Sequence, residues 1–304
     1  MTSGAVVGGV FTEEAAEAVL VSACRTAGFD PVGAELLRLG SNAVYRLAGS
    51  PVIVRIARDP GSLADMTRTV RVARWLEGEG FAATRVVAGL EQPLLVDGRV
   101  VTFWVSAQDA VVYADPRELG DLLRRLHRLE EPGSLALPYY DPFQEVWDTL
   151  RALGDLSGDD VAFLNERAER IQKEYDRLDW VLDFGMIHGD ANVGNAIRNR
   201  DGQPLLIDLD GFSLGQREWD LVLTSLYYER FGWHTRTEYE SFVHHYGFDL
   251  MNWPGYPVLA DLRELKMTLW IGHQATTSGT AAEEFARRVH ALRTGGSRKD
   301  WQAF

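Results

Sequence analysis

The sequence predicts an α+β protein of two lobes, a small β-rich first lobe and a larger helical second lobe. In the first third of the chain, short stretches of β-branched residues alternate with turns, whereas the remainder shows the apolar periodicity of helices. At 304 residues, the chain also exceeds the usual size of one compact domain. We therefore expect an N-lobe over residues 1–105 and a C-lobe over residues 106–304.

The expected N-lobe is an antiparallel sheet with one helix inserted after its third strand. An amphipathic helix over residues 12–27, ended by Gly28, precedes the sheet. The inserted helix covers residues 62–77. The expected strands are residues 34–39, 43–47, 52–56, 83–87 and 100–105.

The expected C-lobe is helical on both sides of one irregular segment. Its first helix carries an apolar stripe at i, i+3, i+4 and i+7, formed by Leu119, Leu122, Leu123 and Leu126. Further helices are expected at residues 142–153, 161–178, 216–231, 237–246, 257–273 and 281–292. The segment 186–211 lacks this periodicity and ends in a strand-like run over residues 204–208.

Charge, apolar runs and cysteine content indicate which partners and which cellular compartment suit this chain. The formal net charge of -13 argues against a nucleic-acid partner, and it favours a cationic substrate or reflects solubility alone. No apolar run approaches the roughly 20 residues that span a bilayer, so we expect no membrane partner. The single cysteine, Cys24, and an N-terminus without a basic region suit a reducing cytoplasm rather than secretion.

The residue types needed for phosphoryl transfer occur together in the irregular segment. This reaction requires a carboxylate that accepts the acceptor's hydroxyl proton, and hard oxygen ligands for Mg²⁺. Asp190 and Asn195 lie in one loop, His188-Gly189-Asp190-Ala191-Asn192-Val193-Gly194-Asn195. Asp208 closes the apolar run after it, where a carboxylate is costly unless a cation or hydrogen bonds compensate it.

This pattern, H-G-D-x-x-x-x-N followed by an apolar strand ending in I-D, resembles the aminoglycoside phosphotransferase and choline kinase superfamily, relatives of the protein kinases. The resemblance implies a protein-kinase-like fold, with Asp190 as catalytic base and Asn195 and Asp208 as magnesium ligands. It also implies transfer of the γ-phosphoryl group of ATP or GTP to a small-molecule hydroxyl. The acceptor would be an aminoglycoside or other antibiotic, an amino-alcohol or a sugar.

Weaker likenesses extend over residues 34–221. The turn Gly40, Ser41 and Asn42 resembles the family's nucleotide loop, whose N–H groups approach the β-phosphate. The segment Phe103, Trp104 and Val105 lies where the family's hinge meets adenine. Asp220 matches an aspartate that braces the catalytic loop, and residues 119–129 resemble a helix ending in a leucine-histidine pair.

Two positions depart from the protein-kinase pattern. Arg55 stands where protein kinases carry the phosphate-binding lysine, and it retains the charge and can bind phosphate through two donors. The usual glutamate partner is replaced by Thr69. Either Asp65, one turn earlier, takes its place or Arg55 pairs elsewhere. The sequence leaves open whether Asp210 contacts a second metal ion or His188, or is a solvated turn residue.

His188 and Asn192 are expected to shape the loop rather than to react. Two other functions remain open from the sequence. The chain could be a non-catalytic nucleotide-binding relative, or a metal-dependent hydrolase that uses the same carboxylates.

The later helices are rich in acids and aromatics that could form an acceptor-binding wall suited to an amine. Each of these residues is nevertheless expected to pack in the core or to lie at the surface. They are Glu238, Glu240, Asp249, Trp253, Asp261, Glu264 and Trp270.

Overall fold

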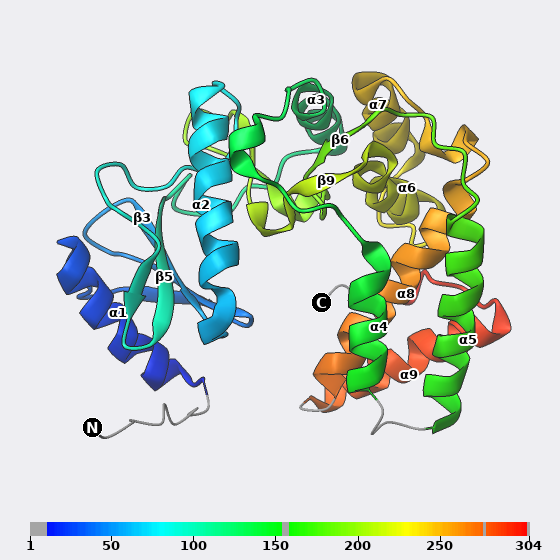
Figure 1. The fold of residues 1–304 in the computed structure, drawn as a ribbon, viewed down its shortest axis with the longest axis horizontal. Helices are drawn as coiled ribbons and strands as arrows, with labels where there is room; N and C mark the ends of the chain where they lie inside the picture. The colour runs from blue at the N-terminus through cyan, green and yellow to red at the C-terminus, as the bar shows by residue number, and fades with distance from the viewer. Residues whose placement is uncertain (1–10, 154–157, 276–277, 303–304) are drawn as a thin grey trace. The chain divides into compact units, whose positions relative to one another are not determined.

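A computed structural model describes residues 11–153, 158–275 and 278–302 (Figure 1). The chain divides into two compact units. The first contains the described residues up to Val112 and returns for Ile197–Asp210, and the second contains Tyr113–Ala196 and the described residues from Gly211 onward. We expected the first lobe to end at residue 105, so the segment 197–210 is an addition that the sequence did not indicate.

The first unit contains the antiparallel sheet that the sequence predicted, with the strand order β1-β2-β3-β5-β4. Its strands are β1 (Glu35–Leu39), β2 (Asn42–Arg46), β3 (Val52–Ala57), β4 (Leu94–Val96) and β5 (Arg99–Val105). The helix α1 (Glu13–Ala27) precedes the sheet, and α2 (Leu63–Gly78) follows β3. Thr12 caps α1 at its start and Gly28, at φ 79°, ends it, as expected.

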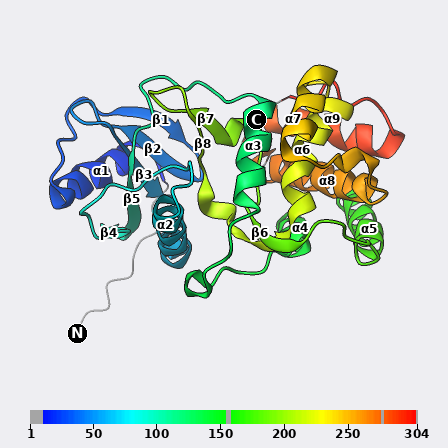
Figure 2. The same cartoon turned by 90° about the horizontal axis from the view of Figure 1, so that it is seen from above.

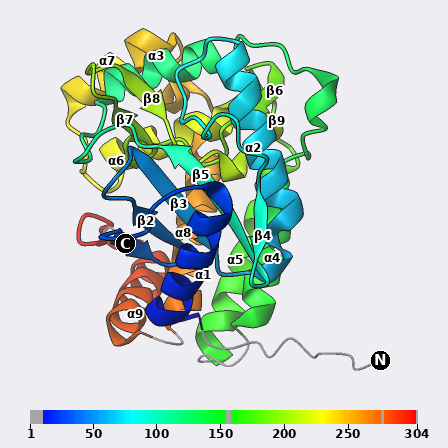
Figure 3. The ribbon, with the colours of Figure 1, turned by 90° about the vertical axis from the view of Figure 1, so that its left-hand side faces the viewer.

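The two helices of the first unit cover opposite faces of this sheet (Figures 2 and 3). Side chains alternate along a strand, so Val54 and Ile56 of β3 join the core beneath α1. Ala57 packs instead with Met66 of α2. The same alternation places Arg55 on the α2 face of the sheet.

One predicted strand was wrong. Residues 83–87 form only isolated bridges, at Ala83 to Leu206 and at Val86 to Trp104, whereas the short edge strand is β4. The remainder of the first unit is a hairpin in which β7 (Ala196–Arg198) pairs with β8 (Pro204–Leu206). Its turn contains Asp201 and Gly202, as predicted.

The second unit is helical with one small two-stranded sheet, β6 (Phe184–Ile187) against β9 (Ser213–Gln216). Its helices are α3 (Pro116–Leu126), α4 (Pro142–Ala152), α5 (Gly158–Tyr175), α6 (Val222–Glu229), α7 (Arg236–Tyr246), α8 (Tyr256–Ala275) and α9 (Gly279–Thr294). The helix expected over residues 216–231 was too long. Its first part is the end of β9 and a 3₁₀ turn, Arg217–Leu221.

Helix α8 lies at the centre of the second unit. It packs against α4, α5, α6 and α9 (Figure 2). Its buried residues include the polar Glu264 and Thr268, whose groups must find hydrogen-bond partners inside the protein. None of the helices in the described part of the chain combines the length and apolar character that crossing a membrane requires.

Candidate active site

The loop after β6 holds Asp190 by contacts from Asn195. The Asn195 amide nitrogen donates to the main-chain oxygen of Asp190 at 2.8 Å and to its carboxylate Oδ2 at 2.9 Å. The nitrogen is thereby turned toward Asp190, so Oδ1 of Asn195 is the atom that remains for a metal. The two residues predicted as base and metal ligand are therefore adjacent.

The backbone before Asp190 is braced by Asp220. This fully buried carboxylate accepts the N–H groups of His188 at 2.7 Å and Gly189 at 2.9 Å. Trp219 Nε1 donates to the Gly189 carbonyl at 2.9 Å. The predicted bracing role of Asp220 is confirmed.

Glycine is required at position 189. Its φ is +86°, and an added Cβ would lie 2.4 Å from the carbonyl oxygen of Gly211. Any side chain would push the loop away from the segment after β8. The requirement for glycine in the H-G-D motif is therefore steric.

A buried histidine directly after α3 completes the brace. His127 Nε2 lies 3.0 Å from Asp220 Oδ2, and its Nδ1 lies 2.8 Å from the Tyr246 hydroxyl of α7. Burial alone would raise the pKa of Asp220, but the net effect of its surroundings lowers it. The opposing causes are the hydrogen bond from His127, the charges of His127 and His188, and the His188 N–H. The leucine-histidine pair noted in the sequence therefore supports the loop through Asp220.

Two further loop residues have the structural roles expected of them. His188 is fully buried, and its Nδ1 lies 3.4 Å from the Asp190 N–H. Asn192 accepts the Gly194 N–H at 2.8 Å and donates to the Asp190 carbonyl at 3.0 Å, which closes the turn.

In the first unit, Arg55 pairs with Asp210. Its Nη2 and Nη1 lie 2.5 Å and 3.3 Å from the two carboxylate oxygens. The buried Thr69 donates its hydroxyl to the same carboxylate at 3.1 Å. Asp65 instead pairs with Arg68 at 2.8 Å. Of the two options for Arg55, the structure shows the second.

This pairing also answers the question about Asp210. It is not a solvated turn residue, because its carboxylate binds Arg55 and Thr69. Burial alone would lower the pKa of Arg55, but the charge and hydrogen bond of Asp210, followed by the charge of Asp208, leave it raised.

Asp208 lies just beyond β8 and is exposed. Its φ of 58° is in the left-handed region, which is uncommon outside glycine and recurs at functional sites. The strand predicted to reach residue 208 ends at Leu206. Asp208 belongs to the first unit and Asn195 to the second.

The other predicted nucleotide contacts lie in the first unit. Gly40 and Ser41 form the exposed turn between β1 and β2, where the Gly40 N–H closes the hairpin on the Asn42 carbonyl at 3.0 Å. The Ser41 carbonyl accepts the Arg58 N–H at 3.1 Å. The loop therefore has a fixed shape.

The predicted adenine contacts differ in exposure. Phe103 is fully buried, and its N–H donates to Gln92 Oε1 at 2.7 Å. Trp104 is also buried and donates to Thr102 Oγ1 at 2.8 Å. Val105 alone of the three exposes its side chain. Phe103 and Trp104 thus act as packing residues of β5.

The sequence did not indicate a cationic and aromatic cluster beside Asp190. Arg263 of α8 binds Asp190 Oδ1 through Nη2, and its guanidinium lies 5.4 Å from the centre of the Trp219 ring. Lys266, one turn later, lies 3.0 Å from the Tyr140 hydroxyl. The available signal was their i, i+3 spacing, which puts both cations on one helix face.

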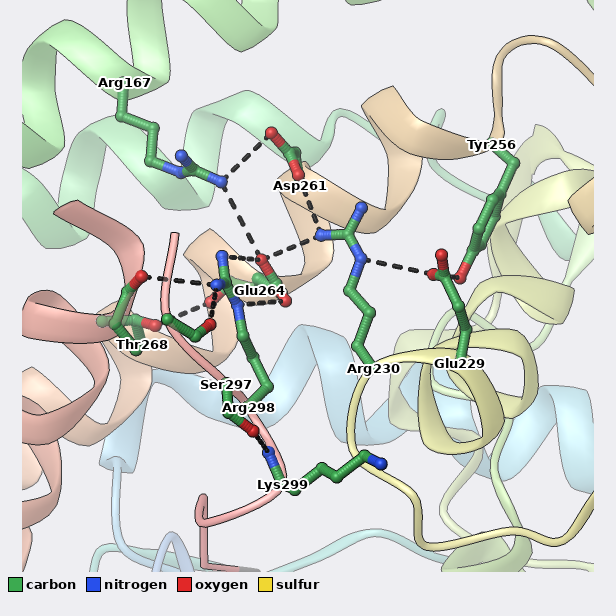
Figure 4. A network of polar contacts seen from close by, with 12 residues as sticks. Arg167, Glu229, Arg230, Tyr256, Asp261, Glu264, Thr268, Ser297, Arg298 and Lys299 are labelled. Carbon is green, nitrogen blue, oxygen red and sulfur yellow. Dashed lines mark hydrogen bonds and ion pairs between the residues drawn. The ribbon is translucent and has the colours of Figure 1, made fainter. Parts of the chain in front are cut away.

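The acids considered for an amine-binding wall are engaged within the second unit. Glu238 caps the start of α7, Glu240 pairs with an arginine one turn earlier, and Asp249 accepts the Tyr239 hydroxyl at 2.6 Å. The acids of α8 are bonded to buried arginines (Figure 4). These residues stabilise the fold and do not present an acidic wall.

Comparison with known proteins agrees with this geometry. Residues 35–262 match the family described as Phosphotransferase enzyme family. No curated protein matches the chain in sequence.

Solved structures share the fold at low identity. Amicoumacin kinase hAmiN, with AMP-PNP, Ca²⁺ and Ami, has a TM-score of 0.72 at 16% identity and covers 96% of this chain and 98% of its own. Spectinomycin phosphotransferase APH(9)-Ia, with ADP and spectinomycin, has a TM-score of 0.59 at 14% identity, with coverages of 86% and 85%. Choline kinase LicA from Streptococcus pneumoniae has a TM-score of 0.62 at 15% identity, with coverages of 91% and 98%.

Proposed function

The chain belongs to the phosphotransferase enzyme family, and we propose that it transfers the γ-phosphoryl group of ATP or GTP, with Mg²⁺, to a hydroxyl of a small molecule. The observation that carries the proposal is the double contact of Asn195 with Asp190 in a loop braced by Asp220. This arrangement fixes a half-exposed carboxylate and an amide oxygen side by side, as phosphoryl transfer to a hydroxyl requires.

Asp190 is the proposed general base. Its side chain is 50% exposed, so an acceptor hydroxyl can approach it. The contact from Asn195 to Oδ2 and the contact from Arg263 to Oδ1 fix the plane of the carboxylate. A base held in this way orients the hydroxyl and accepts its proton as the new bond forms.

Asn195 and Asp208 are the proposed magnesium ligands, and their chemistry fits the ion. Mg²⁺ prefers hard oxygen ligands and retains several waters, so one carboxylate and one amide oxygen suffice. When bound, the ion would neutralise charge on the β- and γ-phosphates.

The nucleotide is proposed to bind the first unit. Arg55, fixed by Asp210, offers its positive charge to the α- and β-phosphates. The turn of Gly40, Ser41 and Asn42 is proposed to lie against the β-phosphate and to bind it through main-chain N–H groups other than that of Gly40, which already closes the hairpin. At the adenine end, Val105 would contact the base, while Phe103 and Trp104 shape the end of β5. The nucleotides named in the solved relatives support a nucleotide donor.

The acceptor is proposed to be a hydroxylated small molecule that reaches Asp190 from the side of α8. Antibiotics, amino-alcohols and sugars are the classes under test, and the names of the solved relatives support the first two.

The test compares nucleotide binding and turnover in matched variants. Titration calorimetry of ATP with and without Mg²⁺ is run on the wild type, on Asp208→Ala, and on Asp201→Ala, which removes an exposed turn acid of the hairpin that precedes Asp208. We expect Mg²⁺ to tighten ATP binding in the wild type and Asp201→Ala but not in Asp208→Ala. An unchanged magnesium dependence in Asp208→Ala contradicts the ligand assignment. Binding without any transfer, over a broad screen of alcohols, supports the non-catalytic alternative.

A further inference from the structure

Helix α8 separates acids from cations on two faces. Asp261 and Glu264 lie on one face, and Arg263 and Lys266 lie on the other, about 200° around the helix from Asp261 to Arg263. This separation decides which charges an acceptor at Asp190 can meet.

The acidic face is fully used inside the protein (Figure 4). Asp261 lies 2.8 Å from Arg230 and 3.1 Å from Arg167. Glu264, with no exposed surface, lies 2.9 Å from Arg230 and 3.0 Å from Arg298. These contacts fix the rotation of α8, and they keep both carboxylates away from an incoming ligand.

The cationic face is buried, whereas its acidic partners are not. The side chains of Arg263 and Lys266 are 12% and 10% exposed, but those of their partners Asp190 and Glu145 are 50% and 65% exposed. Glu145 can swing into water, but this would leave the buried ammonium of Lys266 without a counter-charge, so an incoming anion would have to replace it. The buried cations cannot leave, so the fixed charge at this place is positive.

Arg263 also retains an unused donor. Its Nε is buried and has no hydrogen-bond partner within the described residues. Its guanidinium rests on Trp219 and is fixed there by the contact with Asp190. A buried donor without an acceptor is costly, and an oxygen-rich ligand group would satisfy it.

Lys266 connects this cluster to a hollow of the surface. A pocket of about 320 Å³ between α4 and α8 is lined by Lys266, Glu145, Trp270 and His273, among others. Burial lowers the pKa of Lys266, and the nearby Glu145 opposes this shift. The lysine therefore lies between the pocket and the Arg263–Asp190 pair.

We propose that Arg263 and Lys266 form a subsite for an anionic group of the acceptor, so that the substrate is a hydroxylated acid rather than an amine. This inference rests on the proposed phosphotransferase function. A carboxylate or a phosphate ester at this place would exchange with Glu145 on Lys266 and satisfy the spare donor of Arg263. The acceptor hydroxyl would then lie beside Asp190, which Asn195 and Arg263 hold in place.

The test uses acceptors that differ only in charge. With Mg·ATP and the full chain, phosphorylation is measured for glycerate, glycerol and serinol, and for glucuronate, glucose and glucosamine. Glycerol phosphate is added as a separate arm, which distinguishes a phosphate-bearing acceptor from a carboxylate. We expect kcat/KM to fall at least 10-fold from acid to amine within each triplet.

Variants then assign the preference to the two cations. Lys266→Met and Arg263→Met should each reduce the ratio of acid to neutral turnover at least 5-fold. Arg236→Met, which removes an exposed charge of α7, should leave that ratio unchanged. Circular dichroism melting identifies a variant that fails to fold, and Lys266→Gln then replaces it.

Two results would overturn the proposal. The first is a neutral or amine acceptor with a kcat/KM as high as that of the matching acid. The second is a ratio of acid to neutral turnover that neither substitution changes. Where no compound is phosphorylated, calorimetry of the same compounds on the Mg·ATP complex decides, and the absence of acid-selective binding rejects the subsite. Intact magnesium-dependent ATP binding in that case limits the failure to the subsite, whereas its absence rejects the phosphotransferase function itself.

Discussion

Replacing Asp210 by alanine tests whether Arg55 depends on the partner that the structure shows. The substitution removes two hydrogen bonds to the guanidinium and one from the Thr69 hydroxyl. Hydrogen bonds to charged groups contribute about 1.5–3 kcal/mol each, and breaking a fully buried ion pair costs about 3–5 kcal/mol. Because the Arg55 and Asp210 side chains retain 15% and 33% exposure, we expect a loss near the lower limit, about 2–3 kcal/mol of unfolding free energy.

The assay is urea unfolding followed by tryptophan fluorescence. Asp65→Ala is the matched control, because Asp65 is the partner that the sequence offered and its own ion pair with Arg68 is exposed. We expect that variant to lie within about 0.5 kcal/mol of the wild type. Adding Arg55→Met to Asp210→Ala should recover part of the loss, since the stranded charge is removed. Equal stability of Asp210→Ala and Asp65→Ala would refute the reasoning.

Three further outcomes are expected. Asp190→Asn should lower turnover at least about 10²-fold with little change in ATP affinity, and full activity in an acceptor assay would remove Asp190 from the mechanism. Because the pKa of Asp220 is lowered in the folded protein, its stabilisation is present above its ordinary value of 3.8 and is lost as the pH falls through the folded value. The unfolding free energy of the wild type should therefore exceed that of Asp220→Asn by about 2–4 kcal/mol at pH 6, and the difference should shrink below pH 3.8; a constant difference argues against this role. Burial, followed by the charge of Asp30, raises the pKa of Cys24 to about 11, so a disulfide reagent at pH 8 should label it only after unfolding, and immediate labelling of the native protein would contradict its burial.

Local signals in the sequence predicted most elements of the fold. Thr12 and Gly28 mark the ends of α1 because capping depends on neighbouring residues alone. The apolar stripe of α3 likewise needs no knowledge of its partner. The prediction of a strand at residues 83–87 was wrong because pairing at a sheet edge depends on residues that are distant in sequence. The edge strand is β4 instead.

The site was predictable where its residues lie close together in sequence. Asp190 and Asn195 share one loop, and their contact follows from the motif. Arg55 and Asp210 are 155 residues apart, and Arg263 lies 73 residues from Asp190. Periodicity predicts on which face of its own helix or strand a residue lies, but it does not predict which other element packs against that face. The partner of Arg55 and the cluster on α8 therefore needed the structure.

Four of the aspartates between residues 190 and 220 show how surroundings divide one residue type into different tasks. Asp220, fully buried, stays ionised because backbone N–H groups and His127 surround it, so it fixes the loop. Asp210 is bound to Arg55, which holds that guanidinium in place on the sheet. Asp190 remains half-exposed and meets a buried arginine on one oxygen, which leaves it accessible to a hydroxyl. Asp208 has a left-handed backbone and is exposed, and we propose it as a ligand of a hydrated magnesium ion. Contacts within the fold thus give Asp220 and Asp210 structural tasks, whereas the proposed base, Asp190, is half-exposed and is contacted on both of its carboxylate oxygens.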